Sequence, residues 1–261
     1  NIFCGPKINA SFGVASQVTG QVASISQGLF NALAPEITAS EGRGNRERVI
    51  SLALRASKFS VLLTSLLLIP VLMETDMILG LWLKEVPPFT AALCRIALIA
   101  FLIDKMTIGY MVAVGAKGRI AGYQFTLGSI LLLAPLIAWL AFINGANVAV
   151  AVGWSVLTTK LFCSLGRVWW VKHLMDTPMR RWFAVVLVRS LITIAVPMSC
   201  IQAIQVFWAP SLARLLVEVL LSGGILCISS WFFGFDQDER RYVSSNIRRF
   251  FQILRQRTTH G

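Results

Sequence analysis

The sequence predicts an all-α, polytopic membrane helix bundle of about seven transmembrane helices, on three observations. Of the 261 residues, 56% are hydrophobic and only 14% are charged, whereas soluble domains carry about a quarter charged residues. Several apolar runs approach or exceed the roughly 20 residues that a helix needs to cross the hydrocarbon core of a bilayer. The strongly basic segments fall on alternate loops between these runs, which is typical of a multi-pass protein.

The first predicted span, residues 8–38, is more polar than a lipid-facing helix, but its polarity is organised. At about 100° per residue, polar or small side chains fall on one face and aliphatic side chains on the other. The polar face carries Gln17, Gln21, Ser24, Gly28 and Asn31. We therefore expect one face of this helix to meet water and the other to meet protein or lipid.

The remaining spans follow from apolar runs between loop signals. A basic, glycine-rich loop at residues 41–48 leads into an apolar stretch, residues 57–73, and Pro70 is expected to kink its far end. Residues 77–83 are too short to cross and contain Trp82, so we expect an interfacial helix there. Five further spans are predicted at residues 89–114, 123–143, 148–171, 182–207 and 211–233.

Lysine and arginine are distributed very unequally between the two sides that these spans define. One side carries sixteen and the other only two, Lys7 and Lys84. Because the spans were assigned from hydropathy alone, the asymmetry supports them independently, and we expect the basic side to be cytoplasmic. The sixteen are Arg43, Arg46, Arg48, Arg55, Lys58, Lys117, Arg119, Lys172, Arg180, Arg181, Arg240, Arg241, Arg248, Arg249, Arg255 and Arg257.

The net charge of +12 would raise the question of nucleic acid in a soluble protein. Here the charge lies mainly in short loops beside the spans, so membrane lipids are expected as partners and nucleic acid is not. The tail, residues 236–257, places Ile247, Phe250, Phe251 and Leu254 among arginines. It is expected either to lie on the anionic inner leaflet or to be a solvated tail that only orients the protein.

Little in the sequence indicates metal or catalytic chemistry. The five cysteines occur singly with no CxxC pair, and the only histidines are His173 and His260, so we expect no metal site and no cofactor. The loops offer basic residues in place of the His, Asp or Glu clusters of an enzyme. The chain is therefore expected not to be an enzyme, with a membrane glycosyl- or acyltransferase as the alternative.

Six basic residues remain inside the predicted spans. Arg189 and Arg214 lie near helix ends, where we expect them to snorkel toward water. An ionised side chain deeper in a span costs about 2.5–3.5 kcal/mol on insertion scales and usually faces a cavity or a partner. The four deeper residues are Arg95, Lys105, Lys160 and Arg167.

The spacing of these residues predicts two local arrangements. Lys160 and Arg167 are seven residues apart with Ser164 between them, so all three share one helix face. Asp104 is adjacent to Lys105, and a local ion pair is expected to neutralise it. One interpretation is a water-filled cationic cavity for an anionic, phosphate-bearing ligand. The other is that each charge pairs with a neighbour and only stabilises helix packing.

Two segments resemble a known family. GPKINASFGVASQV at residues 5–18 and NALAPEITAS at residues 31–40 resemble the polysaccharide-exporting flippases of the multidrug/oligosaccharidyl-lipid/polysaccharide superfamily. SKFS at 57–60, ILGLWL at 78–83 and VP at 86–87 are similar to the family's next helix and outer loop. The resemblance covers most of residues 1–175, and Glu36 departs from it, since related sequences commonly have Gln after the proline.

The resemblance implies a two-lobed, MATE-like transporter of which this chain is the C-terminal lobe. Residues 1–175 would run from the end of the family's seventh helix to its twelfth, residues 176–233 would add two transmembrane helices, and residues 234–261 would form the basic cytoplasmic tail. The implied activity is flipping of undecaprenyl-pyrophosphate-linked oligosaccharide across the bacterial inner membrane for surface polysaccharide synthesis. The missing N-terminal lobe of the same protein would be a partner.

The expected substrate site combines the two sets of residues identified above. Arg95, Lys105, Lys160 and Arg167 would attract the pyrophosphate, while Gln17, Gln21, Ser24 and Asn31 would contact sugar. A cation-coupled multidrug exporter of the same superfamily is an alternative that would rely on intramembrane acids, and we expect Asp104 to be the only acid deep in a span. A membrane partner that transports nothing is a further alternative.

Overall fold

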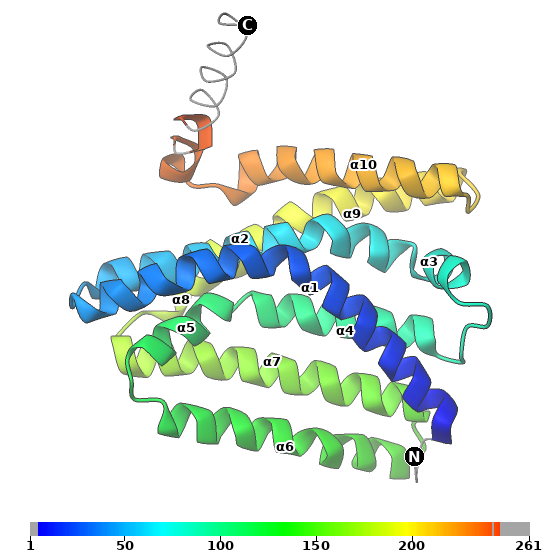
Figure 1. The fold of residues 1–261 in the computed structure, drawn as a ribbon, viewed down its shortest axis with the longest axis horizontal. Coiled ribbons are helices and arrows are strands. Elements are labelled where there is room, and N and C mark those ends of the chain that lie inside the picture. Colours follow the sequence, from blue (N-terminus) through cyan, green and yellow to red (C-terminus); the bar gives the residue numbers. More distant parts are fainter. Residues whose placement is uncertain (1–4, 242, 246–261) are drawn as a thin grey trace, which may run out of the picture.

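The computed structural model describes residues 5–241 and 243–245, and within this part every regular element is helical (Figure 1). The predicted all-α polytopic bundle is therefore confirmed, while the predicted amphipathic pattern of residues 247–254 lies outside the described residues. The elements are α1 (Gly5–Gly42), α2 (Arg46–Met73), α3 (Thr75–Trp82), α4 (Thr90–Lys105), α5 (Ile108–Ala116), α6 (Ala121–Ile143), α7 (Val148–Met175), α8 (Met179–Trp182), the π-helical η1 (Phe183–Val188), α9 (Arg189–Phe207), α10 (Leu212–Ser229) and the π-helical η2 (Ser230–Gly234).

Five helical runs in the described part are long and apolar enough to cross a membrane. They are α2, α6, α7, the continuous run from α8 through η1 to α9, and α10 with η2. The pair α4 and α5 makes a sixth only when taken together. The 38 residues of α1 form one helix that is too polar to join these five, so its status as a span stays a prediction.

The third predicted span, residues 89–114, is not one straight helix, because α4 and α5 meet at a bend of 43°. No proline or glycine lies at the bend itself, residues 105–108. The amide of Gly109, which an unbroken helix would donate to the carbonyl of Lys105, donates instead to Ser57 Oγ of α2 (3.0 Å). A Cβ on Gly109 would lie 1.9 Å from the carbonyl oxygen of Ala53. The close approach of α5 to α2 thus accounts for the break.

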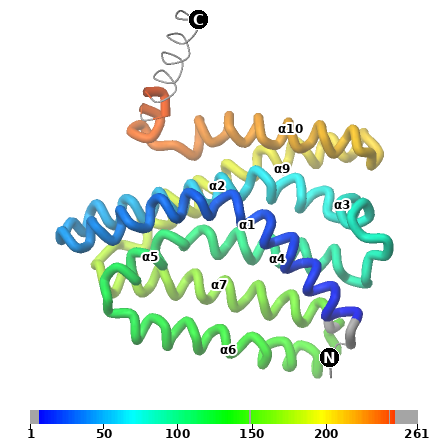
Figure 2. Tube along the Cα trace, viewed as in Figure 1, coloured from blue at the N-terminus to red at the C-terminus, as the bar shows by residue number. Residues whose placement is uncertain are grey.

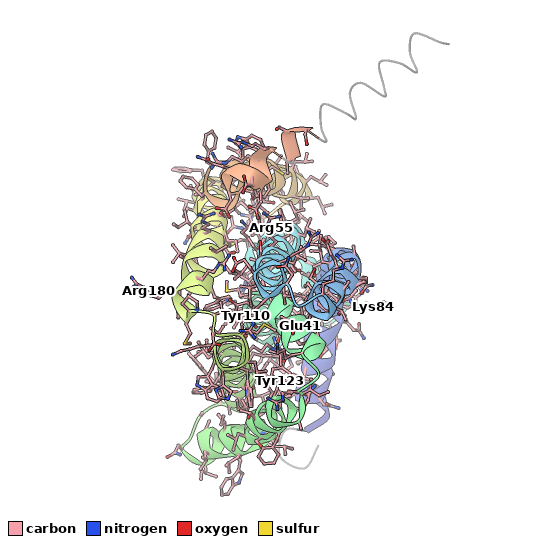
Figure 3. All side chains as sticks on the ribbon, turned by 90° about the vertical axis from the view of Figure 1, so that its left-hand side faces the viewer. Glu41, Arg55, Lys84, Tyr110, Tyr123 and Arg180 are labelled. Carbon is pink, nitrogen blue, oxygen red and sulfur yellow. The ribbon has the colours of Figure 1, made fainter. Side chains whose placement is uncertain are left out.

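The helices form an elongated slab in which most of them run roughly side by side (Figures 1 and 2). The α9 and α10 helices occupy one edge and α6 the other, with α7 beside α6 (Figure 1). Figure 3 shows α1 and the run through η1 into α9 on opposite sides of α2. Ile50 and Ile69 of α2, Tyr110 of α5, Val168 of α7 and Ile201 of α9 belong to one continuous buried core.

The basic loops gather at one end of the slab, which we call the basic end (Figure 1). Lys117 Nζ lies 2.8 Å from Glu41 Oε1, joining the loop after α5 to the end of α1. Arg181 Nη2 lies 2.6 Å from Glu47 Oε1, joining α8 to the start of α2. Figure 3 looks at this end, where Arg180 points away from the helices. The basic loops of the described residues thus lie together at one end of the bundle, while the side of the membrane that this end faces stays a prediction.

Arg55 and Lys58 were counted with the basic loops, but the structure places both inside α2. Lys58 is fully buried, and its Nζ lies 2.5 Å from Glu239 Oε2 and 3.5 Å from Asp236 Oδ2. Arg189 also forms an ion pair with Asp236. Burial alone would raise the pKa of Asp236, but the hydrogen bond from Arg189 and the nearby Lys58 and Arg189 charges hold it below its ordinary value. This cluster fastens the chain after η2 to α2.

The short helix α3 lies at the end opposite the basic loops (Figure 1). Leu79 is buried, whereas Leu81 and Trp82 are exposed. An exposed Trp beside an apolar anchor suits the membrane interface, so the predicted helix exists, and its interfacial position stays a prediction.

Candidate functional site

Three basic residues and one acid lie where α4 breaks. Arg167 Nη1 of α7 donates to Asp104 Oδ1 (3.0 Å), and Lys160 Nζ lies 3.5 Å from the same oxygen. Lys105 is 94% buried with its Nζ 4.9 Å from the centre of the Phe101 ring. Among the described residues no hydrogen bond or ion pair of the Lys105 ammonium is found. Two bases therefore contact the single carboxylate, and Lys105 adds a third positive charge beside them.

Side chains from the second half of the molecule also satisfy the backbone of the break. Ser164 Oγ donates to the carbonyl of Ile103 (3.2 Å), and Arg167 Nη1 donates to the carbonyl of Asp104 (3.3 Å). Trp182 Nε1 donates to the carbonyl of Met106 (2.8 Å). Such partners are what allow a helix to break at membrane depth. Arg167 is accordingly both a counter-ion and a cap for the broken helix.

The predicted shared face of α7 is confirmed, whereas the predicted local ion pair is wrong. Ser164 and Arg167 are buried and Lys160 is half-buried, and all three approach the end of α4. The carboxylate of Asp104 is neutralised by these α7 bases and not by its neighbour Lys105. Successive residues of a helix point in directions about 100° apart, so Lys105 turns toward Phe101 instead.

Arg95 does not join this cluster. It forms an ion pair with Asp76, and the side chains of Arg95 and Asp76 are 40% and 72% exposed. Arg95 precedes Asp104 by nine residues, about 13 Å along a helix. It therefore lies toward the end of the slab opposite the basic loops, where an exposed pair is worth little energy.

The four polar residues predicted on the first helix, Gln17, Gln21, Ser24 and Asn31, are all exposed in the structure. The opposite face of α1 packs through Val18 and Val22 against Leu68 of α2 and Leu98 of α4. The amphipathic prediction is thereby confirmed. Among the described residues no hydrogen bond or ion pair joins these four residues to Lys160 or Arg167, and their convergence on one chamber stays a prediction.

Two cavities lie elsewhere, and none of the eight predicted site residues lines either one. The larger, about 1040 Å³, opens between α1, α2 and the segment after η2. Its walls combine apolar side chains such as Leu33 and Phe59 with the charged Glu36, Arg48 and Arg55. Glu36 and Arg48 pair with each other at 2.6 Å. The smaller, about 390 Å³, is lined by Met73, Glu74, Asp76, Met77, Pro210 and Arg214.

The smaller cavity borders a buried charged cluster that corrects two expectations. Arg214 is buried and pairs with Glu74, so it does not snorkel. Glu218 is fully buried within α10, so Asp104 is not the only acid deep in a span. The sequence does hold a signal for this cluster, since Arg214 and Glu218 stand four residues apart in an otherwise apolar run.

The described residues contain no group of three or more His, Cys, Asp or Glu side chains that could hold a metal ion. Scans against family models, curated proteins and solved structures find no match for this chain. The fold and the site define a multi-pass, all-α membrane protein with charged clusters between its helices. Its resemblance to the polysaccharide flippases stays a prediction.

Proposed function

We propose that this chain is the C-terminal lobe of a transporter that flips undecaprenyl-pyrophosphate-linked oligosaccharide across the bacterial inner membrane. The observation that carries the proposal is the cluster at the broken helix, where three positive charges gather beside the single acid Asp104. Lys160 and Arg167 contact its carboxylate, and the buried Lys105 adds a positive charge that no described acid pairs with. Charges inside membrane helices mark substrate or ion paths more often than not. An excess of positive charge there favours an anionic substrate.

The broken helix supports transport in particular. Substrate sites of secondary transporters are typically formed where a transmembrane helix is discontinuous, near the middle of the bilayer. The break between α4 and α5 brings the carbonyl of Asp104 and the side chain of Thr107 to the guanidinium of Arg167, whose Nη1 lies 3.3 Å from the carbonyl oxygen and 3.2 Å from Thr107 Oγ1. Arginine binds phosphate oxygens through two parallel hydrogen bonds, and lysine binds them as a point charge.

Binding of a pyrophosphate would proceed by exchange of counter-ions. Arg167 Nε is buried and donates no hydrogen bond to any described residue, so the guanidinium keeps a free donor while Nη1 holds Asp104. A phosphate oxygen would compete with Asp104 for Arg167 and Lys160. The exposed polar face of α1 would contact the sugar and face the N-terminal lobe.

The test is the charge-neutralising pair Lys160→Gln and Arg167→Gln in the full-length protein, measured as surface polysaccharide and as protein abundance in the membrane. The proposal expects loss of polysaccharide at unchanged abundance. The matched control is Lys172→Gln with Arg180→Gln, which removes two exposed bases at the basic end and should leave export intact. Normal polysaccharide in the Lys160 and Arg167 variant would exclude the proposal.

A multidrug exporter of the same superfamily is the second candidate, and one observation favours it. The buried acids Glu74 and Glu218 are the kind of groups on which a cation-coupled exporter relies. An exporter would raise resistance to hydrophobic cations when expressed in a sensitive host. A flippase would leave that resistance unchanged, so the assay separates the two functions.

A further inference from the structure

A second buried charge cluster joins α2, α9 and α10 at the end of the slab opposite the basic loops. Arg214, near the start of α10, pairs through Nη2 with Glu74 at the end of α2. Its Nη1 donates to the carbonyl of Trp208 (2.6 Å), and its Nε lies 3.5 Å from Glu218 Oε1. Glu74, Arg214 and Glu218 are exposed by 3%, 5% and 0%.

Gln205 of α9 shows how close the two carboxylates are. Its Nε2 lies 3.2 Å from Glu74 Oε1 and 3.3 Å from Glu218 Oε2. One amide nitrogen therefore donates to both acids. The charged groups that face Glu218 are Glu74 from α2 and Arg214 from its own helix, while α9 contributes the neutral Gln205.

The charges of this cluster do not balance when both acids are ionised. Two carboxylates then share one guanidinium in a place from which water is largely excluded, and the extra negative charge is strongly disfavoured. Two carboxylates side by side normally resolve this conflict by holding one proton between them. The geometry also decides which acid holds it.

Glu74 and Glu218 are not equivalent partners of Arg214. Glu74 Oε1 receives both the guanidinium Nη2 and the Gln205 amide. Glu218 accepts a hydrogen bond from the Gln205 amide alone among the described residues, and the guanidinium reaches its Oε1 only through Nε at 3.5 Å, without a hydrogen bond. The guanidinium therefore stabilises a charge on Glu74 more than a charge on Glu218, and this difference favours Glu218 as the acid that carries the proton.

The smaller cavity gives this pair a route to the surface. Glu74 and Arg214 form part of its wall, together with Asp76 and Met77 of α3 and Pro210 of the loop between α9 and α10. Figure 1 shows that α3 and this loop lie away from the basic loops. We propose that Glu218, together with Glu74 and Arg214, forms a proton-binding site that exchanges with the compartment on the side opposite the basic loops. The ligand is a proton and not a metal cation, because the guanidinium between the acids repels a metal and the described residues hold no group of three or more His, Cys, Asp or Glu side chains that could bind one.

Infrared difference spectroscopy on the purified full-length protein tests the proposal directly, because a protonated carboxyl group has a carbonyl stretch that disappears on ionisation. Spectra taken between neutral and alkaline buffer should show loss of one such band in the wild type. Glu218→Gln and Glu74→Gln should each abolish it, because either change leaves one carboxylate for one guanidinium. Asp104→Asn, in the other cluster, should keep it.

Labelling keeps the test decisive if a variant fails to fold. In the wild type, carboxyl-¹³C glutamate should shift the band and carboxyl-¹³C aspartate should not. A band that persists in Glu218→Gln, or that shifts only with labelled aspartate, would overturn the proposal. The readout is protonation and not transport, so it stands or falls separately from the flippase assignment.

Discussion

Arg167 Nη1 and Asp104 Oδ1 are 3.0 Å apart, and this ion pair joins α7 to the last turn of α4. Because Arg167 also donates to the carbonyl of Asp104 (3.3 Å), one guanidinium holds both the side chain and the backbone of the break. The pair therefore has a structural role whatever its function. The question is whether Arg167 does more than neutralise Asp104.

The double variant Asp104→Asn with Arg167→Gln separates the two roles. Removing both charges leaves the net charge of the cluster as in the wild type, because Lys105 and Lys160 remain. The double variant should therefore lose less stability than the sum of the two single losses, by a coupling of about 0.5–3 kcal/mol. Export should nevertheless stay lost, because no guanidinium remains to bind phosphate. Thermal unfolding in detergent and surface polysaccharide measure the two quantities.

The single variants Asp104→Asn and Arg167→Gln are measured beside the double variant, so that the coupling between the two residues can be obtained. If the double variant regained export along with stability, Arg167 would be only a counter-ion of Asp104. The proposed anion site would then have to be abandoned even though the ion pair itself is real.

The exposed polar face of α1 is predicted to line water in the full-length protein. A cysteine at Gln21, introduced after replacement of the five native cysteines, should react with a small charged maleimide in intact membranes. A cysteine at Leu132 of α6 should not, although Leu132 is 79% exposed in the isolated bundle, because apolar α6 faces lipid. Mass spectrometry of the labelled protein measures both.

If the cysteine at position 21 reacted with the maleimide as little as the cysteine at position 132, α1 would be covered by lipid or by another protein surface. In that case the face formed by Gln17, Gln21, Ser24 and Asn31 contacts no sugar. The pyrophosphate cluster would be unaffected by this result, since it rests on different helices.

Hydropathy predicted the helices well because burial in lipid depends on local composition. The run at residues 123–143 matches α6, Ala121–Ile143, within two residues. The amphipathic face of α1 was also predictable, since about 100° per residue is a property of the helix alone. The gathering of basic loops at one end followed from counting charge on alternate loops.

Contacts between distant segments were not predictable from the sequence. The break after Lys105 arises from the approach of Gly109 to Ala53, which the local sequence does not show. The sequence predicted an ion pair between Asp104 and its neighbour Lys105, whereas the partners of Asp104 in the structure come from α7, more than fifty residues away. Pairing of buried charges is a tertiary property, and spacing along one helix predicts only which residues share a face.

The buried pair of Lys58 and Glu239 is predicted to fasten the segment after η2 to α2. Glu239→Gln should lower the free energy of unfolding by about 2–3 kcal/mol, less than the roughly 3–5 kcal/mol for a fully orphaned buried charge. The expected loss is smaller than that because Lys58 keeps a second acidic partner, Asp236, whose Oδ2 lies 3.5 Å from Lys58 Nζ. Chemical unfolding in detergent micelles measures it, and Glu85→Gln, at an exposed position, should change nothing.

A loss of less than about 0.5 kcal/mol, the usual range for exposed substitutions, would show that Lys58 is solvated in the membrane-embedded protein. The segment after η2 would then be held by other contacts.

Gly109 is predicted to be the least replaceable glycine of the described chain. A methyl group there would lie 1.9 Å from the Ala53 carbonyl oxygen and 2.7 Å from its carbon, and helix backbone yields less easily than a flexible side chain. Gly109→Ala should therefore destabilise the fold by about 1–3 kcal/mol or more and push α5 away from α2. Thermal unfolding in detergent is the measurement.

Gly128→Ala is the matched control, because nothing lies within 4 Å of a Cβ at that position of α6. Alanine is a better helix former than glycine by about 1 kcal/mol, so this variant should unfold at the same or a higher temperature than wild type.

In Gly109→Ala, the separation of α5 from α2 should also break the hydrogen bond from the Gly109 amide to Ser57 Oγ (3.0 Å). Gly109→Ala should therefore lower export beyond any fall in abundance, because Asp104 and Arg167 meet at the same break. Full export per molecule in Gly109→Ala would show that the geometry of the break does not matter for transport.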